Sequence, residues 1–406
     1  MFNYLTYKME ENNSIIKRKI TKIFKQYKIT LISNLNSIDI SIQNNSNIYI
    51  SNYNSGYLQK LFIENNTKEE IIEIISTLIE HNRIEIIENK INLKLILKPT
   101  FINNLNIVLI LNKKKQLRIL KSIDAHIKCV NSISIFPSGK IISVSNDKSI
   151  NIYDINFNII QHIENAHNNS INCVDIIDEN NFVTCSDDKN IKIWSKIKNE
   201  FKINKIINDA HNDCITYVIY FSNKKIISCS FDKTVKIWEE KEKNYQLMTT
   251  LRHTYFIWSL LYLKDKNILI SSGWDGTKIW NINNFELIKY IKEVECYSWN
   301  AMCRIDKDKI IIGQGQLLKI ISLFEKKIIK EIQLTFDSIG IILIKEKGIF
   351  LIGGRSNDIL MYNNYNYECI QTYENVHDKE ICGFIQLKND LIASYSFDGK
   401  IKIWSF

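Results

Sequence analysis

The sequence predicts an all-β repeat protein preceded by a small α+β domain, and three observations carry this prediction. Segments of similar sequence recur along residues 124–406. Within each repeat, apolar residues alternate with polar ones between turns rich in Asn, Asp, Lys and Gly, which is typical of antiparallel strands. Residues 1–112 lack the repeat and are interpreted separately.

The repeats are clearest where a strand-like segment ends on an aromatic residue. Five of them read "SNDKSINIYD", "SDDKNIKIWS", "SFDKTVKIWE", "GWDGTKIWN" and "SFDGKIKIWS", with aromatic residues Tyr153, Trp194, Trp238, Trp280 and Trp404. Two weaker repeats, "QGQLLKIIS" and "RSNDILMYN", place Ile321 and Tyr362 at the same position. The mean period is about 42 residues, and four short strands per period predict a seven-bladed β-propeller.

A second periodicity links a histidine to an aspartate in five repeats. The histidine lies 21 residues before the aspartate, or 22 in the fourth repeat. Together with the strand-end aromatics, this pattern resembles the WD-repeat β-propeller family over about 280 residues. The resemblance implies that each blade is held by a hydrogen-bonded tetrad of His, Asp, the strand Trp and the Ser two residues before the Asp. The implied members are His126, Ser145, Asp147, His167, Ser186, Asp188, Trp194, His211, Ser230, Asp232, Trp238, His253, Asp275, Trp280, His377, Ser396, Asp398 and Trp404.

The same residue types could form a catalytic triad, but a triad occurs once, whereas this set recurs in successive repeats. The sequence also lacks a phosphate-binding Gly loop, a His-Glu-x-x-His motif and a dinucleotide fingerprint. We therefore expect no enzyme activity, no cofactor, no metal and no small-molecule substrate. The nine cysteines are odd in number and contain no Cys-x-x-Cys pair, which predicts free thiols in a reducing, intracellular compartment, the cytoplasm, with the nucleus as an alternative.

Repeats five and six depart from the pattern. They carry Val294 and Thr335 at the histidine position, and Gly315 and Ser356 at the aspartate position. We expect these two blades to be the least rigid, or to be held by contacts with a partner.

The last repeat has no fourth strand of its own, since the sequence ends two residues after Trp404. An unpaired edge strand is a template for aggregation. The segment "QLRILKSI" at 116–123 has a strand pattern but no blade, and in the family such a strand closes the ring. We expect residues 116–123 to pair with 400–405, within a propeller domain spanning 113–406.

Residues 1–112 predict a small α+β domain in which we recognise no family. Apolar residues at helical spacing predict a helix over 14–28, and a capping-box pattern predicts another over 67–83. Strand-like segments follow each of them.

Candidate partner-binding residues come from the family resemblance. It implies that side chains just before the conserved Asp, and three and five residues after the His, point to one face of the propeller. These positions give Phe231, Phe256, Trp258, Trp274, Trp299, Arg355 and Phe397. The equivalent positions of repeats one and two are polar. Two interpretations are open, a binding patch and packing between blades, with an aromatic cage for a methylated lysine as a narrower version of the first.

The leading hypothesis for function is a non-catalytic protein-interaction scaffold or adaptor that binds a protein or peptide on this face. The alternative is a substrate-recruiting subunit of a ubiquitin ligase or another multiprotein enzyme complex. The net charge of +9 permits membrane or nucleic-acid contact, but the Lys-rich stretches at 16–28 and 189–205 are better explained as solvated faces. The sequence does not identify the partner or the oligomeric state.

Overall fold

A computed structural model describes residues 117–406 except 223 and 243, together with the backbone of seven strands between residues 18 and 113. The chain divides into two compact units, residues 1–116 and 117–406.

The described part of the first unit is an antiparallel sheet of seven strands in the order β1-β2-β3-β4-β7-β6-β5. The strands are β1 (Arg18–Phe24), β2 (Tyr27–Ser33), β3 (Ser37–Gln43), β4 (Ile48–Asn54), β5 (Ile84–Glu88), β6 (Asn92–Leu97) and β7 (Ile107–Lys113). The helix expected over 14–28 is wrong where residues are described, because β1 and β2 form a hairpin there. Isoleucine, which supplies much of the helical spacing, favours extended backbone through its branched side chain. The helix expected over 67–83 lies outside the described residues, so α+β for residues 1–112 stays a prediction.

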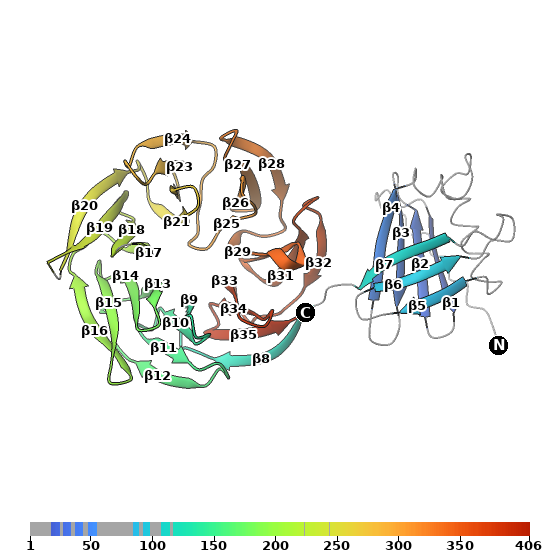
Figure 1. Cartoon of the computed structure of the whole chain (residues 1–406), viewed down its shortest axis with the longest axis horizontal. Coiled ribbons are helices and arrows are strands. Elements are labelled where there is room, and N and C mark those ends of the chain that lie inside the picture. Colours follow the sequence, from blue (N-terminus) through green and yellow to red (C-terminus); the bar gives the residue numbers. More distant parts are fainter. Residues whose placement is uncertain are drawn as a thin grey trace. The chain divides into compact units, whose positions relative to one another are not determined.

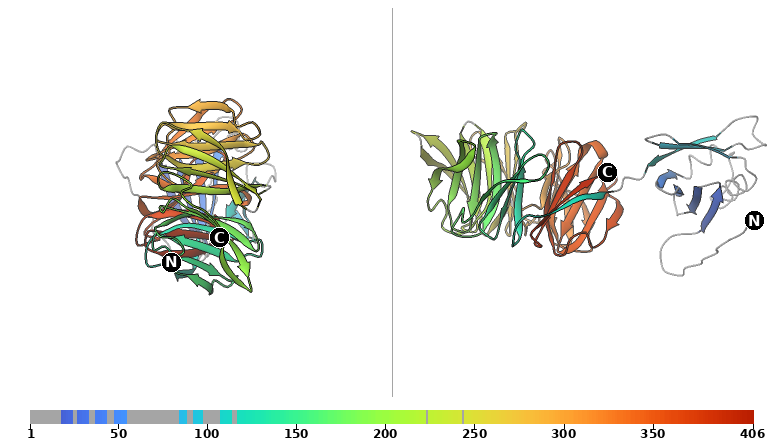
Figure 2. Two further views of the ribbon diagram at one scale, coloured as in Figure 1. Left: turned by 90° about the vertical axis from the view of Figure 1, so that its left-hand side faces the viewer. Right: turned by 90° about the horizontal axis from the view of Figure 1, so that it is seen from below.

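Residues 117–406 form seven four-stranded antiparallel sheets around a central axis, seen along the axis in Figure 1 and turned by 90° in Figure 2. The first strand of each blade lies nearest the axis (Figure 1). Blade one comprises β9 (Val130–Ile135), β10 (Ile141–Ser145), β11 (Ile150–Tyr153) and β12 (Ile159–Ile163). Blade two comprises β13 (Ile171–Asp178), β14 (Asn181–Ser186), β15 (Ile191–Ile197) and β16 (Glu200–Ile207). Blade three comprises β17 (Ile215–Ser222), β18 (Lys225–Ser230), β19 (Thr234–Lys241) and β20 (Asn244–Arg252).

The remaining blades continue the same up-and-down order. Blade four comprises β21 (Ile257–Leu263), β22 (Ile268–Gly273), β23 (Gly276–Asn281) and β24 (Leu287–Ile291). Blade five comprises β25 (Met302–Arg304), β26 (Lys309–Gln314), β27 (Leu317–Ser322) and β28 (Lys327–Gln333). Blade six comprises β29 (Ser338–Ile344), the 3₁₀ turn η1 (Lys345–Lys347), β30 (Ile349–Gly354), β31 (Ser356–Asn363) and β32 (Cys369–Tyr373).

Blade seven draws on both ends of the propeller segment and closes the ring. It comprises β33 (Ile381–Gln386), β34 (Ile392–Ser396), β35 (Lys400–Ser405) and β8 (Arg118–Asp124). In the antiparallel register of β8 and β35, Lys400 lies opposite Asp124 and Ser405 opposite Arg118. The open edge of β35 is thereby paired within the chain, which removes a site for edge-to-edge association.

The hydrophobic core lies between neighbouring blades. Phe136 of blade one, for example, packs in one buried cluster with Phe182 and Trp194 of blade two. The rings of Phe182 and Trp194 stack with centroids 5.6 Å apart. Each blade is therefore stabilised by the next one, as in other repeat architectures.

All nine cysteines are free thiols, and six of them are buried. In the part of the chain that the structure describes, no helix has the length and apolar character needed to cross a membrane.

Candidate functional site

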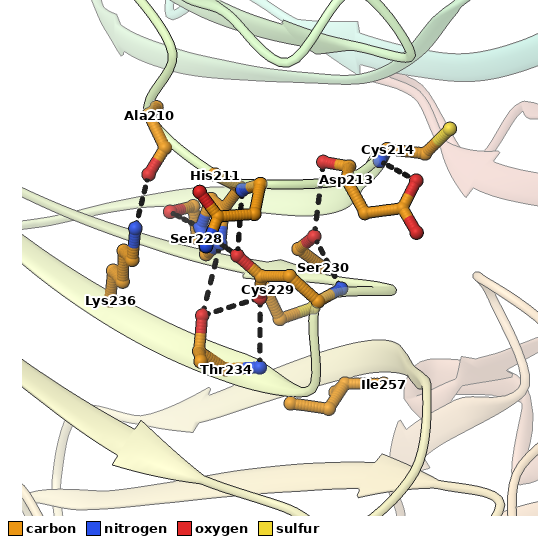
Figure 3. A network of polar contacts seen from close by, with 12 residues as sticks. Ala210, His211, Asp213, Cys214, Ser228, Cys229, Ser230, Thr234, Lys236 and Ile257 are labelled. Carbon is orange, nitrogen blue, oxygen red and sulfur yellow. Dashed lines mark hydrogen bonds and ion pairs between the residues drawn. The ribbon is translucent and has the colours of Figure 1, made fainter.

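His211, Asp232, Ser228 and Trp238 of blade three form a hydrogen-bonded chain that ties the incoming loop to the sheet. Figure 3 shows the part of this chain around His211 and Ser228. His211 Nδ1 lies 2.9 Å from a carboxylate oxygen of Asp232, and His211 Nε2 lies 2.7 Å from Ser228 Oγ. The indole of Trp238 donates to Ser228 Oγ at 2.9 Å. Because a carboxylate only accepts, Nδ1 of the neutral imidazole carries the proton and Nε2 accepts the serine hydroxyl.

The same network recurs in blades one, two, four and seven, and only the hydroxyl and the aromatic residue vary. The hydroxyl that contacts the histidine belongs to Ser143, Thr184, Ser271 and Ser394, respectively. Trp194, Trp280 and Trp404 donate to that hydroxyl in blades two, four and seven. In blade one, Tyr153 OH replaces the indole, 3.4 Å from Ser143 Oγ.

The serine expected in the tetrad is wrong by two residues along the strand. Ser145, Ser186, Ser230 and Ser396, two residues before the Asp, form no hydrogen bond with the histidine or the tryptophan in the described blades. Each instead accepts the backbone N–H of that Asp, at 3.0, 3.0, 2.9 and 3.1 Å. The hydroxyl in the network lies two residues earlier on the same face of the strand.

A lysine contact accompanies the network and was missed in the sequence. In blades two, three, four and seven, a lysine on the third strand donates to the carbonyl of the residue before the histidine. In blade three the pair is Lys236 and Ala210 (Figure 3). Blade five has no histidine but keeps the bond, from Lys319 to Glu293. The recurrent Lys two residues before the strand-end aromatic is the signal that could have revealed it.

The protonation of the network follows from its hydrogen bonds. Burial alone would raise the pKa of Asp188, but the hydrogen bond and charge of His167 and two backbone N–H groups lower it to about 2. Asp232 behaves in the same way, and its pKa falls well below the usual range. Burial lowers the pKa of His167 and His211 against the opposing effect of the carboxylates. At neutral pH the His167–Asp188 and His211–Asp232 pairs are each a neutral imidazole hydrogen-bonded to a carboxylate, which stabilises the fold.

A cavity of about 620 Å³ opens on one edge of the ring at blades four to seven. This edge, called here the loop edge, is formed by the connections between successive blades and by the turns between second and third strands. The cavity is lined by Tyr255, Trp258, Trp274, Glu295, Tyr297, Ser298, Trp299, Gly315, Asp337, Ser338, Ile339, Arg355, Glu380 and Phe397.

One wall of the cavity continues into a chain of aromatic rings in mutual contact. Trp258 contacts Trp299 at a centroid distance of 5.2 Å, and Phe231 contacts Trp258 at 4.8 Å. Phe256 contacts both Phe231, at 5.0 Å, and Trp274, at 5.4 Å. A Cβ on Gly273 would lie 2.1 Å from the carbonyl oxygen of Phe256, so glycine is required for the loop carrying these rings to approach β22.

Blades one and two fill the equivalent positions with polar pairs. Asn131 donates to Asn146 at 2.6 Å and to the carbonyl of Ile171 in the next blade at 2.8 Å. Asn172 makes the corresponding bonds to Asp187 and to the carbonyl of Ile215. Side chains at this position thus join one blade to the next in blades one and two, whereas Trp258 replaces them in blade four.

The tryptophans of the cavity are not hydrogen-bonded as those of the network are. Trp258 Nε1 and Trp299 Nε1 are buried and have no partner among the described residues. Trp274 is 45% exposed. A buried donor without a partner costs about 1–3 kcal/mol, so the fold gains no polar contact from the indoles at these two sites.

Three half-buried carboxylates complete the lining, Glu295, Asp337 and Glu380. Arg355 is the one basic residue that lines the cavity, and it lies 3.5 Å from Asp337. Nowhere in the described residues do three or more His, Cys, Asp or Glu side chains form a group able to hold a metal ion.

The sequence-predicted residues divide between the cavity and its surroundings. Trp258, Trp274, Trp299, Arg355 and Phe397 line the cavity. Phe231 and Phe256 do not line it but support its aromatic wall. The carboxylates and Tyr255 were missed, although Glu380 lies three residues after His377 and so at a position that the family pattern marks.

The comparison with protein families matches the WD domain, G-beta repeat (WD40), at residues 117–154, 159–195, 203–239 and 245–281. These segments cover the closing strand and much of the first four blades. No curated protein matches the chain. Blades five to seven complete the same four-stranded pattern in the structure. The chain thus carries WD40 repeats within residues 117–281, and residues 117–406 form a seven-bladed β-propeller.

Proposed function

We propose that this chain is a non-catalytic interaction module that binds a protein or peptide partner at the loop edge of blades four to seven. The WD40 propeller is a fold generally used for protein–protein interaction, but the fold alone does not locate a site. The observation that carries the proposal is the cavity of about 620 Å³ lined by three tryptophans that take no part in the hydrogen-bond networks.

The size and composition of the cavity favour binding. Ligand pockets typically enclose about 300–1,000 Å³ and combine aromatic walls with a few polar groups. Tryptophan is also enriched among residues that dominate binding energy at interfaces. The partner would bury one anchor against Trp258, Trp274 and Trp299 and contact the surrounding loops through its backbone.

The experiment compares partners captured by the full chain and by single variants. Trp274→Ala should abolish capture, since loss of such an anchor costs more than about 2 kcal/mol, or roughly thirtyfold in affinity. Phe324→Ala is the matched control, because Phe324 is 87% exposed and lies in a turn between third and fourth strands, on the opposite edge of the ring.

Cross-linking and mass spectrometry would identify proteins that depend on Trp274 and not on Phe324, with the melting temperature of each variant measured in parallel. Partners retained by Trp274→Ala, or a Trp274→Ala variant that is destabilised, would contradict the proposal and favour a packing role for these aromatic residues.

A further inference from the structure

We propose that the anchor held in this cavity is the cationic side chain of a lysine or arginine of the partner. This inference rests on the proposed function and adds the chemistry of its ligand. It follows from the combination of aromatic walls with an excess of carboxylates in one cavity.

The aromatic walls suit a cation. A positive group within about 6 Å of a ring centroid is attracted by the electrons of the ring face, most strongly for tryptophan. The cavity offers Trp274 and Tyr297, which are 45% and 43% exposed, and their rings meet edge to face with centroids 6.4 Å apart. The rim already shows this chemistry, since Lys233 Nζ lies 5.7 Å from the ring centroid of Tyr255.

The charges of the lining point the same way. The lining contains three carboxylates and one guanidinium. Asp337 is paired with Arg355, and Glu295 accepts the hydroxyl of Tyr297. Glu380 has no ion-pair or hydrogen-bond partner for its side chain among the described residues and is half-buried. Its carboxylate is the group best placed to pair with an incoming cation.

Other anchors fit less well. An aliphatic side chain would remove the carboxylates from water without pairing them, which is costly. An acidic or phosphorylated side chain would be repelled by the carboxylates. Such groups are recognised by clustered arginines, whereas Arg355 is the one arginine that lines the cavity. The volume of about 620 Å³ leaves room for residues on either side of the basic one, as expected for a peptide rather than a small free cation.

The test uses the full chain labelled with fluorotryptophan, so that each of the seven tryptophans gives one ¹⁹F NMR signal, assigned by Trp→Phe variants. The probes are acetylated peptides Gly-Ser-Xaa-Ser-Gly in which Xaa is lysine, trimethyllysine, arginine, norleucine or glutamate. Tetramethylammonium and ethylguanidinium serve as free cations.

We expect peptides with a cationic Xaa to shift the signals of Trp258, Trp274 and Trp299. The affinity measured from these shifts should be at least tenfold higher than that of the norleucine and glutamate peptides, and higher than that of the free cations. Signals of the four network tryptophans should not move. Glu380→Gln should lower the affinity for the cationic peptides about fivefold or more. The control Glu374→Gln, on an exposed residue outside the cavity, should leave this affinity unchanged.

Equal binding of norleucine, tighter binding of the free cations, or no effect of Glu380→Gln would overturn the inference. The two proposals fail in distinguishable ways. A partner that needs Trp274 but is indifferent to Glu380→Gln contradicts only the cationic anchor, whereas a partner indifferent to Trp274→Ala contradicts the proposed site itself.

Discussion

The propeller uses tryptophan in two regions with opposite hydrogen bonding. In the networks of blades two, three, four and seven, every strand-end indole donates to a buried Ser or Thr hydroxyl at 2.8–2.9 Å. At the loop edge, Trp258 and Trp299 bury the same N–H group without a partner, and Trp274 is half exposed. The first set holds these four blades together, whereas the second lines a cavity. The role of a tryptophan in this fold is therefore inferred from whether its indole N–H has a hydrogen-bond partner, rather than from its burial alone.

Opening the ring should have the largest effect, because both regions depend on the closed propeller. Deleting residues 117–123 removes all of β8 except Asp124 and exposes the edge of β35, so we expect aggregation and loss of the cooperative melting transition. Size-exclusion chromatography and thermal unfolding measure both. A deletion variant that stays monodisperse and melts like the full chain would show that β8 does not close the fold.

Breaking a network at its carboxylate should have the next largest effect. Asp188→Ala leaves the Nδ1–H of a buried imidazole and a backbone N–H unpaired. Asp232→Ala leaves a backbone N–H unpaired and His211 Nδ1 with only the Thr234 hydroxyl. Each change should lower the free energy of unfolding by about 1–3 kcal/mol. Asp154→Ala is the control, since Asp154 only caps a turn beyond its strand, and should cost under about 0.5 kcal/mol. Urea unfolding of the three variants measures the difference. Similar losses at all three sites would contradict the role given to the network.

Acid should destabilise the networks. The pKa of Asp188 and of Asp275 is lowered to about 2, so their stabilisation is complete above pH 4 and is lost as the pH falls towards 2. The lowered pKa of His167 and His211 adds a loss below pH 6.5. Burial raises the pKa of Asp175 to about 6, which opposes this trend between pH 4 and 6.

The free energy of unfolding should therefore change little between pH 6.5 and 4, where these effects oppose each other, and decline steeply below pH 4. Urea titrations at pH 7, 5 and 3 would measure this, and the Asp188→Ala variant should show a shallower decline below pH 4. A stability that is unchanged between pH 5 and 3 would contradict the protonation assigned to the networks.

The sequence predicted the networks well where spacing alone decides. The interval of 21 or 22 residues found each His and Asp pair because both lie in turns that recur once per blade. It could not choose between Ser228 and Ser230, since residues two apart point to the same face of a strand and both serines are buried. In blade two the hydroxyl comes from Thr184, so no single residue type marks the position.

The cavity was harder to predict, for a related reason. Trp258 and Trp274 could be placed because His253 and Asp275 set the register of blade four. Blades five and six lack those landmarks, so Glu295 and Asp337 could not be assigned to the loop edge before the fold was known. At the N-terminus, the isoleucines of residues 18–24 satisfied helical spacing while their branched side chains favour the strand that is observed.

The central claim is that a hydrogen-bond partner for the indole N–H distinguishes structural tryptophans from binding ones. It is tested most directly by comparing Trp238→Phe with Trp258→Phe. Both changes remove the N–H and a similar volume, but only Trp238 loses a hydrogen bond. We expect Trp238→Phe to lower the free energy of unfolding by about 0.5–1.5 kcal/mol more than Trp258→Phe, as measured by urea unfolding followed by circular dichroism. Equal losses, or a larger loss at Trp258, would contradict the claim.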